Sequence, residues 1–168
     1  DRDVKHLREM MTRSYHHKGT GFLEIYQNCN IFNDGAFFAF TEEATKPETA
    51  IFLEHGKPLV FGTNNSKGIR IDGLKPVVVN LEETGFSEND LWIHDETDIY
   101  KSQMLTRFFD SPSTVITDDY LPRPFGVLYA IERPCYEDML FDQLKEAVGK
   151  KGEGDLNQLI AGNQTWTI

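Results

Sequence analysis

The sequence predicts an α/β protein in which a helix and a strand at the beginning are followed by a mixed α+β region with a β-hairpin. Over residues 3–17, apolar side chains recur at the spacing of a helix. A short apolar and aromatic run follows at 21–27, and its length is typical of a buried strand. Two apolar or alternating runs, at 57–62 and 67–72, flank an asparagine-rich turn, which indicates the hairpin.

The remaining elements are predicted from the same kinds of pattern. Residues 36–50 are expected to form a loop or a short helix that packs its phenylalanines inward. Two further strands are expected, at 75–79 and 125–131. Three further helices are expected: one at about 98–109 capped by Thr97 or Asp98, one from near Pro134 to about Val148, and a short one capped by Asp155 that ends at Gly162.

Composition restricts the class of protein and its partners. The chain has 168 residues, enough for one domain with a real core, and 39% of them are hydrophobic. Lys and Arg number 17 against 27 Asp and Glu, and this net charge of -10 would repel phosphate backbones, which argues against a nucleic-acid partner. No apolar stretch approaches the roughly 20 residues of a membrane helix, and no basic-then-apolar leader is present. We therefore expect a cytoplasmic protein without a membrane partner.

Cys29 is the main candidate site residue. It follows the run at 21–27 and is surrounded by the turn-forming residues Asn28, Asn30 and Asn33–Gly35. In open α/β sheets, binding sites lie beyond the carboxyl ends of strands, so a thiolate at this position suggests a metal site. The alternative from the residues alone is a small buried hydrophobe.

Several blocks of the sequence resemble, in order and separation, the beta subunit of 2-oxoacid:ferredoxin oxidoreductases, most closely the branch that uses 2-oxoglutarate. The blocks are His17–Gly35, Leu53–Phe61, Pro122–Tyr129, Glu132–Tyr136, Gly152–Ile160 and Thr165–Ile168. The resemblance implies that the chain is the carboxy-terminal half of such a subunit, and Asp1 lies inside a helical pattern, as at a cut. Residues 1–35 would then be the last helix–strand unit of a thiamine-diphosphate-binding domain, and residues 36–168 a carboxy-terminal extension that contacts another subunit.

The resemblance also implies a role for Cys29 as one of four thiolates that hold a four-iron, four-sulfur (4Fe-4S) cluster. The other three would lie in the amino-terminal half, because a cluster of this kind needs four cysteines and the chain has two. The family often has proline where this sequence has Asn30, and commonly threonine where it has Cys135. We expect Cys135 to be a buried structural thiol. A disulfide between the two cysteines stays open, whereas a C-x-x-C motif is excluded by their separation.

The activity implied by the resemblance belongs to a larger complex with an alpha subunit. That complex uses thiamine diphosphate and magnesium to decarboxylate a 2-oxoacid, passes electrons through the cluster to ferredoxin, and transfers the acyl group to coenzyme A. The family's segment for magnesium and the diphosphate has no counterpart here, because Asn33–Gly35 and Asp72-Gly73 fit turns. We therefore assign no catalytic or cofactor-binding residue, and expect the chain alone to be inactive.

Three alternatives stay open. The same class of enzyme could act on pyruvate or another 2-oxoacid, the chain could be a stand-alone interaction module, or Cys29 could be a nucleophile helped by a histidine. For the histidines we expect structural roles. His16 and His17 would lie at a helix end where the helix dipole stabilises them, and His55 and His94 would occupy surface or turn positions.

Overall fold

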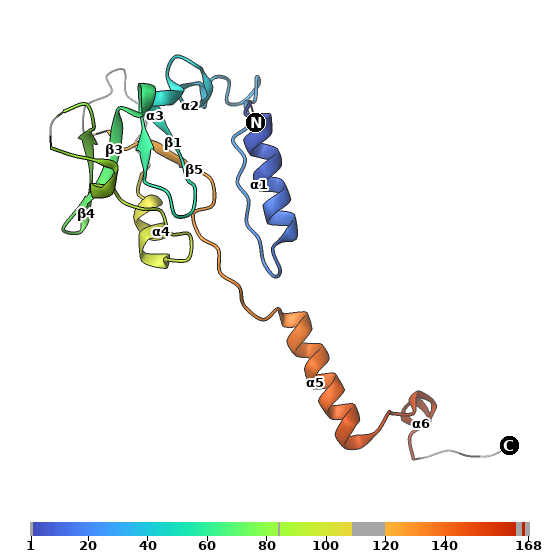
Figure 1. The fold of residues 1–168 in the computed structure, drawn as a ribbon. Coiled ribbons are helices and arrows are strands. Elements are labelled where there is room, and N and C mark those ends of the chain that lie inside the picture. The colour runs from blue at the N-terminus through green and yellow to red at the C-terminus, as the bar shows by residue number, and fades with distance from the viewer. Residues whose placement is uncertain (1, 84, 109–119, 164–165, 167–168) are drawn as a thin grey trace. The chain divides into compact units, whose positions relative to one another are not determined.

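The computed structural model describes residues 2–83, 85–108, 120–163 and 166. Contacts divide the chain into two compact units (Figure 1). Unit 1 comprises residues 1–16 and 22–131, and unit 2 comprises residues 17–21 and 132–168. The predicted mixture of helices and strands with a hairpin is confirmed, and unit 1 holds a parallel two-stranded sheet and an antiparallel three-stranded sheet.

The antiparallel sheet confirms the predicted hairpin and the strand after it. Its order is β2 (Val60–Phe61), β3 (Lys67–Asp72) and β4 (Lys75–Asn80). The connection from β2 to β3 is the short helix η1 (Thr63–Asn65), in which Asn64 has a φ of 58°. Asparagine tolerates this left-handed conformation better than most residues, which explains its place in the turn.

The parallel sheet differs from the expected strands. It pairs β1 (Ala50–Phe52), which the sequence did not indicate, with β5 (Arg123–Phe125). The strand predicted at 125–131 is therefore wrong in position. β5 ends where Gly126 adopts a φ of +126°, and a Cβ there would lie 2.9 Å from the carbonyl oxygen of Leu53. Only glycine fits this bend, so the strand cannot continue through it.

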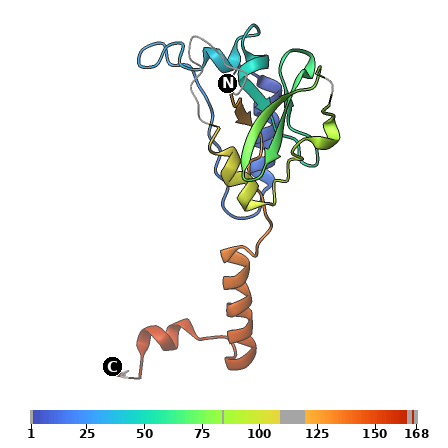
Figure 2. The same cartoon turned by 90° about the vertical axis from the view of Figure 1, so that its left-hand side faces the viewer.

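Helix α1 (Val4–His16) confirms the predicted first helix and packs within unit 1 (Figure 2). The ring of His6 meets that of Phe52 edge-on, with 5.0 Å between centroids. Ion pairs add to this contact: Arg2 with Glu42, Lys46 with Asp3, and Arg13 with Glu96.

Two single-turn helices, α2 (Phe38–Thr41) and α3 (Lys46–Thr49), follow α1 along the chain and precede β1. They fall in the segment predicted as a loop or short helix. Phe40 is buried there as expected, whereas Phe38 is exposed.

Helix α4 (Ile99–Leu105) begins as predicted at Asp98. The Asp98 carboxylate accepts hydrogen bonds from the backbone N–H groups of Tyr100 and Lys101, at 2.9 and 3.1 Å. The helix ends before the predicted limit, and residue 109 lies outside the described residues. Leu105 is buried, but Tyr100 is 77% exposed and does not belong to the apolar face on which it was expected.

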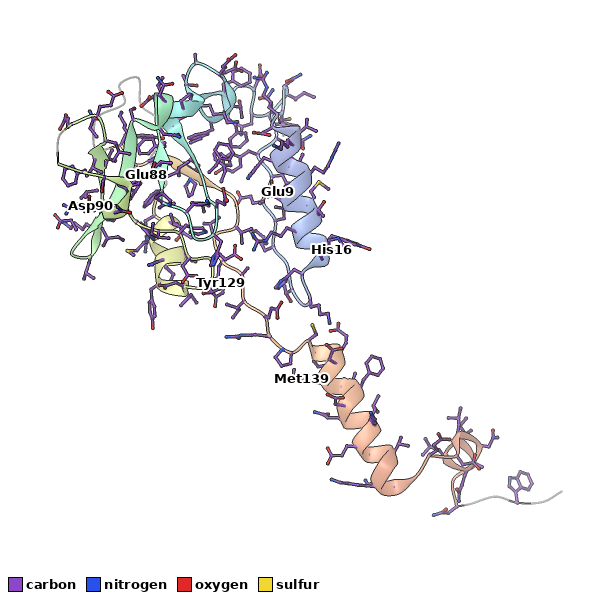
Figure 3. The ribbon with its side chains drawn as sticks, in the orientation of Figure 1. Glu9, His16, Glu88, Asp90, Tyr129 and Met139 are labelled. Atoms are coloured by element: carbon purple, nitrogen blue, oxygen red, sulfur yellow. The ribbon has the colours of Figure 1, made fainter. Side chains whose placement is uncertain are left out.

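The core of unit 1 draws on both sheets and on α4. The short helix η2 (Glu88–Asp90), labelled in Figure 3 by its two ends, precedes the segment that brings Trp92 into this core. The buried members are Ile51, Leu59, Phe61, Ile69, Trp92, Leu105 and Phe108.

The strand predicted at 21–27 is wrong. Residues 20–28 pair with no strand in the part of the chain that the structure describes, and Phe22 is 90% exposed. An apolar run raises the propensity for a strand, but a strand exists only where a neighbour takes its backbone hydrogen bonds.

Unit 2 contains α5 (Tyr136–Lys151) and α6 (Leu156–Ala161). Helix α5 was expected to stop near Val148, but it continues through Gly149 and ends at Gly152, where φ is +78°. Helix α6 confirms its prediction, with Asp155 as its N-cap and Gly162 after its last turn. Neither helix has a buried residue. The tail predicted at 165–168 lies, except for Trp166, outside the described residues.

Candidate functional site

Cys29 lies where the extended segment of unit 1 turns into a short loop. Cys29 and Asn33 form an isolated antiparallel bridge, in which the N–H of Asn33 donates to the carbonyl oxygen of Cys29 at 2.9 Å. The loop therefore doubles back immediately after the cysteine. Its thiol is free and half-buried.

The side chain of Asn28 closes this loop from within. Its Oδ1 accepts the backbone N–H of Gly35 at 2.8 Å. Its Nδ2 donates to Oδ1 of Asn30 at 2.8 Å and to Oδ1 of Asp34 at 3.0 Å. Gly35 has a φ of +77°, a conformation that favours glycine. One amide thus joins both ends of the loop that carries Cys29.

The loop stabilises the thiolate form of Cys29. Backbone N–H groups of Phe32, Ile31 and Asn33 hydrogen-bond to the sulfur and lower the pKa of Cys29 below its ordinary value, while its limited burial opposes the shift. Hydrogen bonds to a charged group favour the charged form. The thiolate is both the metal ligand and the nucleophile in cysteine chemistry, so the geometry suits either role.

The loop that carries Cys29 also presents two large apolar side chains to solvent. Ile31 and Phe32, whose backbones face Cys29, have side chains that are 83% and 89% exposed. Large exposed apolar side chains beside a site are typical of a surface that binds another protein or a ligand.

The part of the chain that the structure describes offers no complete metal site by itself. Within residues 2–83, 85–108, 120–163 and 166, no three His, Cys, Asp or Glu side chains gather in a way that could hold a metal ion. The second cysteine, Cys135, is in unit 2, where it precedes α5. It is half-buried, which corrects the expectation of a buried thiol, because it lies at a helix start in a unit whose helices bury nothing. Both cysteines are free, so the disulfide left open by the sequence is not formed.

The contacts that the structure gives for His55 and His94 do not involve Cys29. His16 ends α1, as expected. His94 corrects a prediction, because it is 1% exposed rather than at the surface, and its Nε2 lies 2.8 Å from the carbonyl oxygen of Val127. Burial lowers the pKa of His94. His55 is exposed, and its Nδ1 accepts the N–H of Glu96 at 3.3 Å.

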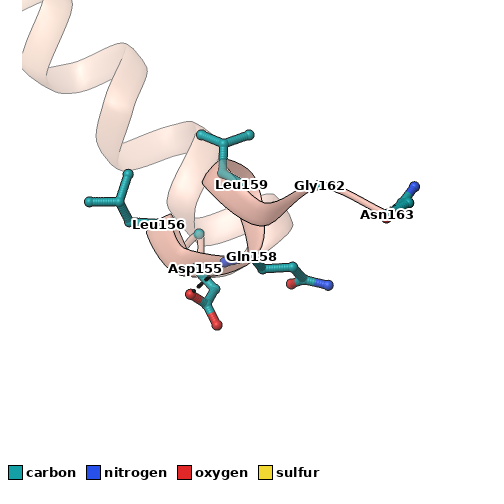
Figure 4. Close-up of a pocket in the computed structure, with 7 residues that line it drawn as sticks. Asp155, Leu156, Gln158, Leu159, Gly162 and Asn163 are labelled. Carbon is teal, nitrogen blue, oxygen red and sulfur yellow. Dashed lines mark hydrogen bonds between the residues drawn. The ribbon is translucent and has the colours of Figure 1, made fainter. Parts of the chain in front are cut away.

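A shallow surface hollow runs along α6 (Figure 4). Its one ionisable side chain is Asp155, whose carboxylate already accepts the N–H groups of Asn157 and Gln158. The hollow therefore provides no reactive group. Its lining residues are Gly154, Asp155, Leu156, Gln158, Leu159, Gly162 and Asn163.

The sequence points to Cys29 as a candidate site residue, but it does not reveal the role of Asn28 in closing the loop. The asparagine-rich composition of the loop could have indicated this role, because Asn side chains hydrogen-bond to nearby backbone groups in turns. Among the described residues, no helix has both the length and the apolar character that crossing a membrane requires.

Comparison with known proteins identifies one relevant similarity. The chain is similar to the 2-oxoglutarate oxidoreductase subunit KorB of Mycobacterium tuberculosis (strain ATCC 25618 / H37Rv), with 29% identity over 171 aligned positions. The match covers 100% of this chain and 43% of KorB, so the chain spans less than half the length of this curated relative. No family model matches the chain, and no solved structure gives a significant match. The resemblance to the beta subunit of 2-oxoglutarate oxidoreductases is thus confirmed by a similarity that extends over the whole chain.

Proposed function

We propose that this chain is the carboxy-terminal part of the beta subunit of a 2-oxoglutarate:ferredoxin oxidoreductase, and that Cys29 is one of the four thiolates that hold its 4Fe-4S cluster. The observation that carries the proposal is the loop at residues 28–35, which surrounds a single thiol with backbone N–H donors. The similarity to KorB supplies the class of enzyme.

The residues present fit a cluster ligand. Cysteine binds metal as the thiolate, and the N–H groups of Ile31, Phe32 and Asn33 stabilise that form. Hydrogen bonds to cluster sulfurs and exclusion of solvent are the usual means by which a protein tunes an iron–sulfur centre. The chain provides one such ligand, and the other three would come from the remainder of the subunit.

The described residues provide no counterpart for thiamine diphosphate or magnesium, so no step of the reaction is assigned to them. When bound in the whole subunit, thiamine diphosphate would supply the decarboxylation chemistry. In this proposal residues 1–35 close the thiamine-binding domain and hold the cluster ligand. Residues 36–168 provide contact surface for the alpha subunit, ferredoxin accepts the electrons, and coenzyme A accepts the acyl group.

A second function has one observation in its favour. The lowered pKa of Cys29 also suits a thiol nucleophile. That chemistry requires a base within reach of the sulfur. The contacts that the structure gives for His55 and His94 do not involve Cys29, which favours the ligand role.

The proposed function is tested with the complete subunit and its alpha partner, purified without oxygen. We expect 2-oxoglutarate, in the presence of coenzyme A, to reduce ferredoxin faster than pyruvate does, and the 168-residue chain alone to be silent. Cys29→Ala should abolish ferredoxin reduction, and Cys135→Ala is the matched control that should retain it. Full ferredoxin reduction by Cys29→Ala would contradict the ligand role, and a faster reaction with pyruvate would reassign the substrate.

A further inference from the structure

Helix α5 presents large apolar side chains with nothing to cover them in the described part of unit 2. It is a helix of 16 residues with no buried residue, and its side chains project freely around it (Figure 3). Phe141 is 65% exposed and Leu144 is 51% exposed. Burial of such side chains is worth about 1.5–3 kcal/mol each, so an uncovered face of this kind strongly favours association.

Most of the large apolar residues of α5 share one face, whereas Met139 falls on the opposite side. At about 100° of rotation per residue, four positions of the helix fall within an arc of roughly 100°. These positions are Leu140, Phe141, Leu144 and Val148. Ala147 lies about 20° beyond the edge of this arc.

Two charged residues of opposite sign complete the same face at its two ends. Glu137 stands in the first turn and Lys151 is the last residue of α5. Both fall within the apolar arc, and Leu144 lies midway between them along the helix. The face is therefore acidic at one end, basic at the other and apolar between.

We propose that α5 pairs antiparallel with α5 of a second copy of this chain, around a two-fold axis at Leu144. In that register Glu137 of each copy meets Lys151 of the other. Leu140 meets Val148, and the large Phe141 meets the small Ala147, which is the alternation that well-packed helices use. A two-fold interface must be self-complementary, and this face is so in both charge and size.

Parallel pairing is disfavoured by the same residues. It would place Glu137 against Glu137 and Lys151 against Lys151, and like charges in contact weaken association. In the antiparallel arrangement the two helix dipoles point in opposite directions, so the positive end of each helix lies beside the negative end of the other, which favours the pairing. The acidic residues Asp142 and Glu146 fall on the opposite side of the helix and stay outside the contact.

Charge reversal tests this pairing in the 168-residue chain by sedimentation equilibrium. The unmodified chain is expected to be a dimer. Glu137→Lys and Lys151→Glu should each raise the dimer dissociation constant at least tenfold, and an equimolar mixture of the two variants should associate as tightly as the unmodified chain. Asp142→Lys is the matched control, since it changes the net charge as Glu137→Lys does but from the opposite side, and it should leave the dimer intact.

Cross-linking tests the position of the two-fold axis. In a chain carrying Cys29→Ser and Cys135→Ser, Leu144→Cys should form an intermolecular disulfide under mild oxidation, because the axis brings position 144 of both copies together. Leu140→Cys should not cross-link with itself, but should do so when mixed with Val148→Cys. Circular dichroism of each variant verifies that its helix content is retained.

The proposal is overturned if the unmodified chain is a monomer at about 100 µM. It is also overturned if the chain binds only an alpha subunit through α5, or if Leu140→Cys cross-links with itself as readily as Leu144→Cys. It does not depend on Cys29, so loss of the dimer in Glu137→Lys should leave iron binding by the complete subunit unchanged.

Discussion

Arg123 donates a hydrogen bond of 2.8 Å from Nη1 to the phenolic oxygen of Tyr26, and so joins β5 to the extended segment that leads to Cys29. The ring of Tyr26 stacks on Phe37, with 4.4 Å between centroids, and meets the edge of Phe125 at 5.5 Å. The guanidinium of Arg123 lies 5.1 Å above the ring of Phe40. These contacts hold the extended segment in place although it has no strand partner in the described chain.

Tyr26→Ala is expected to lower the free energy of unfolding of the chain by about 3 kcal/mol, because it removes both the ring contacts and the hydrogen bond. Tyr26→Phe keeps the ring but removes the hydroxyl that accepts from Arg123, and it should cost about 1–2 kcal/mol. Urea denaturation measures both values. Tyr100→Phe is the matched control, since Tyr100 is 77% exposed, and its effect should stay within about 0.5 kcal/mol. Equal effects for Tyr26→Phe and Tyr100→Phe would show that the bond to Arg123 contributes nothing.

Alkylation of Cys29 by iodoacetamide should begin at a lower pH in the folded chain than in urea. Three backbone N–H groups lower the pKa of the folded thiol, so the reactive thiolate persists at pH values where the unfolded thiol is already protonated. Mass spectrometry of the peptide that contains Cys29, after timed labelling between about pH 6 and pH 10, measures the midpoint.

Asn28→Ala should move that midpoint back toward the value in urea, because the amide of Asn28 closes the loop that aims the N–H groups at the sulfur. Gln27→Ala is the control on the preceding residue, and it should leave the midpoint unchanged. Identical midpoints for the folded and the unfolded chain would contradict the proposed role of the loop.

The buried His94 should make the chain less stable in acid. Burial lowers the pKa of the folded imidazole below its usual 6.5 and outweighs the nearby carboxylates of Glu96 and Asp95, which raise it. As the pH falls below 6.5, the unfolded chain therefore takes up a proton that the folded chain does not. The free energy of unfolding then falls, by up to about 1.4 kcal/mol per pH unit, until the folded pKa is reached.

His94→Gln retains a donor for the carbonyl oxygen of Val127 but does not titrate. Urea denaturation of both chains at pH 7.5 and pH 5.5 should show a larger loss of stability in the unmodified chain. An equal loss in both would mean that His94 does not contribute to the acid sensitivity.

Gly126→Ala should destabilise the chain by about 1–3 kcal/mol. Its φ of +126° strains any side chain, and the added Cβ would lie 2.9 Å from the carbonyl oxygen of Leu53. Gly154→Ala is the matched control, because a Cβ there would have no atom within 4 Å. Thermal unfolding compares the two variants, and equal midpoints would show that the bend after β5 tolerates a side chain.

Elements governed by local chemistry could be predicted from the sequence. Helix caps at Asp98 and Asp155, the hairpin with its asparagine turn, and the stop at Gly162 all depend on neighbouring residues. Each of these signals specifies the backbone within a few positions of itself.

Elements that depend on distant partners could not be predicted. β1 and β5 form only because they meet across some 70 residues, and neither run stands out alone. The run at 21–27 has the composition of a strand but lacks a neighbour in the described chain. His94 is buried by surrounding elements, which a local pattern of His, Asp and Glu cannot show.

Cys29 could be singled out from the sequence as a candidate, but the contacts around its sulfur could not be predicted. Cys29 stood out because turn residues surround it, whereas the N–H donors that stabilise its thiolate arise from the folded path of residues 31–33.

The most direct test of the account is the iron and acid-labile sulfide content of the complete subunit, purified without oxygen, for the unmodified protein, Cys29→Ala and Cys135→Ala. We expect four irons per subunit, with the electron paramagnetic resonance signal of a reduced cluster, in the unmodified protein and in Cys135→Ala. We expect fewer than four irons and loss of that signal in Cys29→Ala. Four irons with an unaltered signal in Cys29→Ala, or a complete unmodified subunit that contains no iron, would contradict the assignment of Cys29 as a cluster ligand.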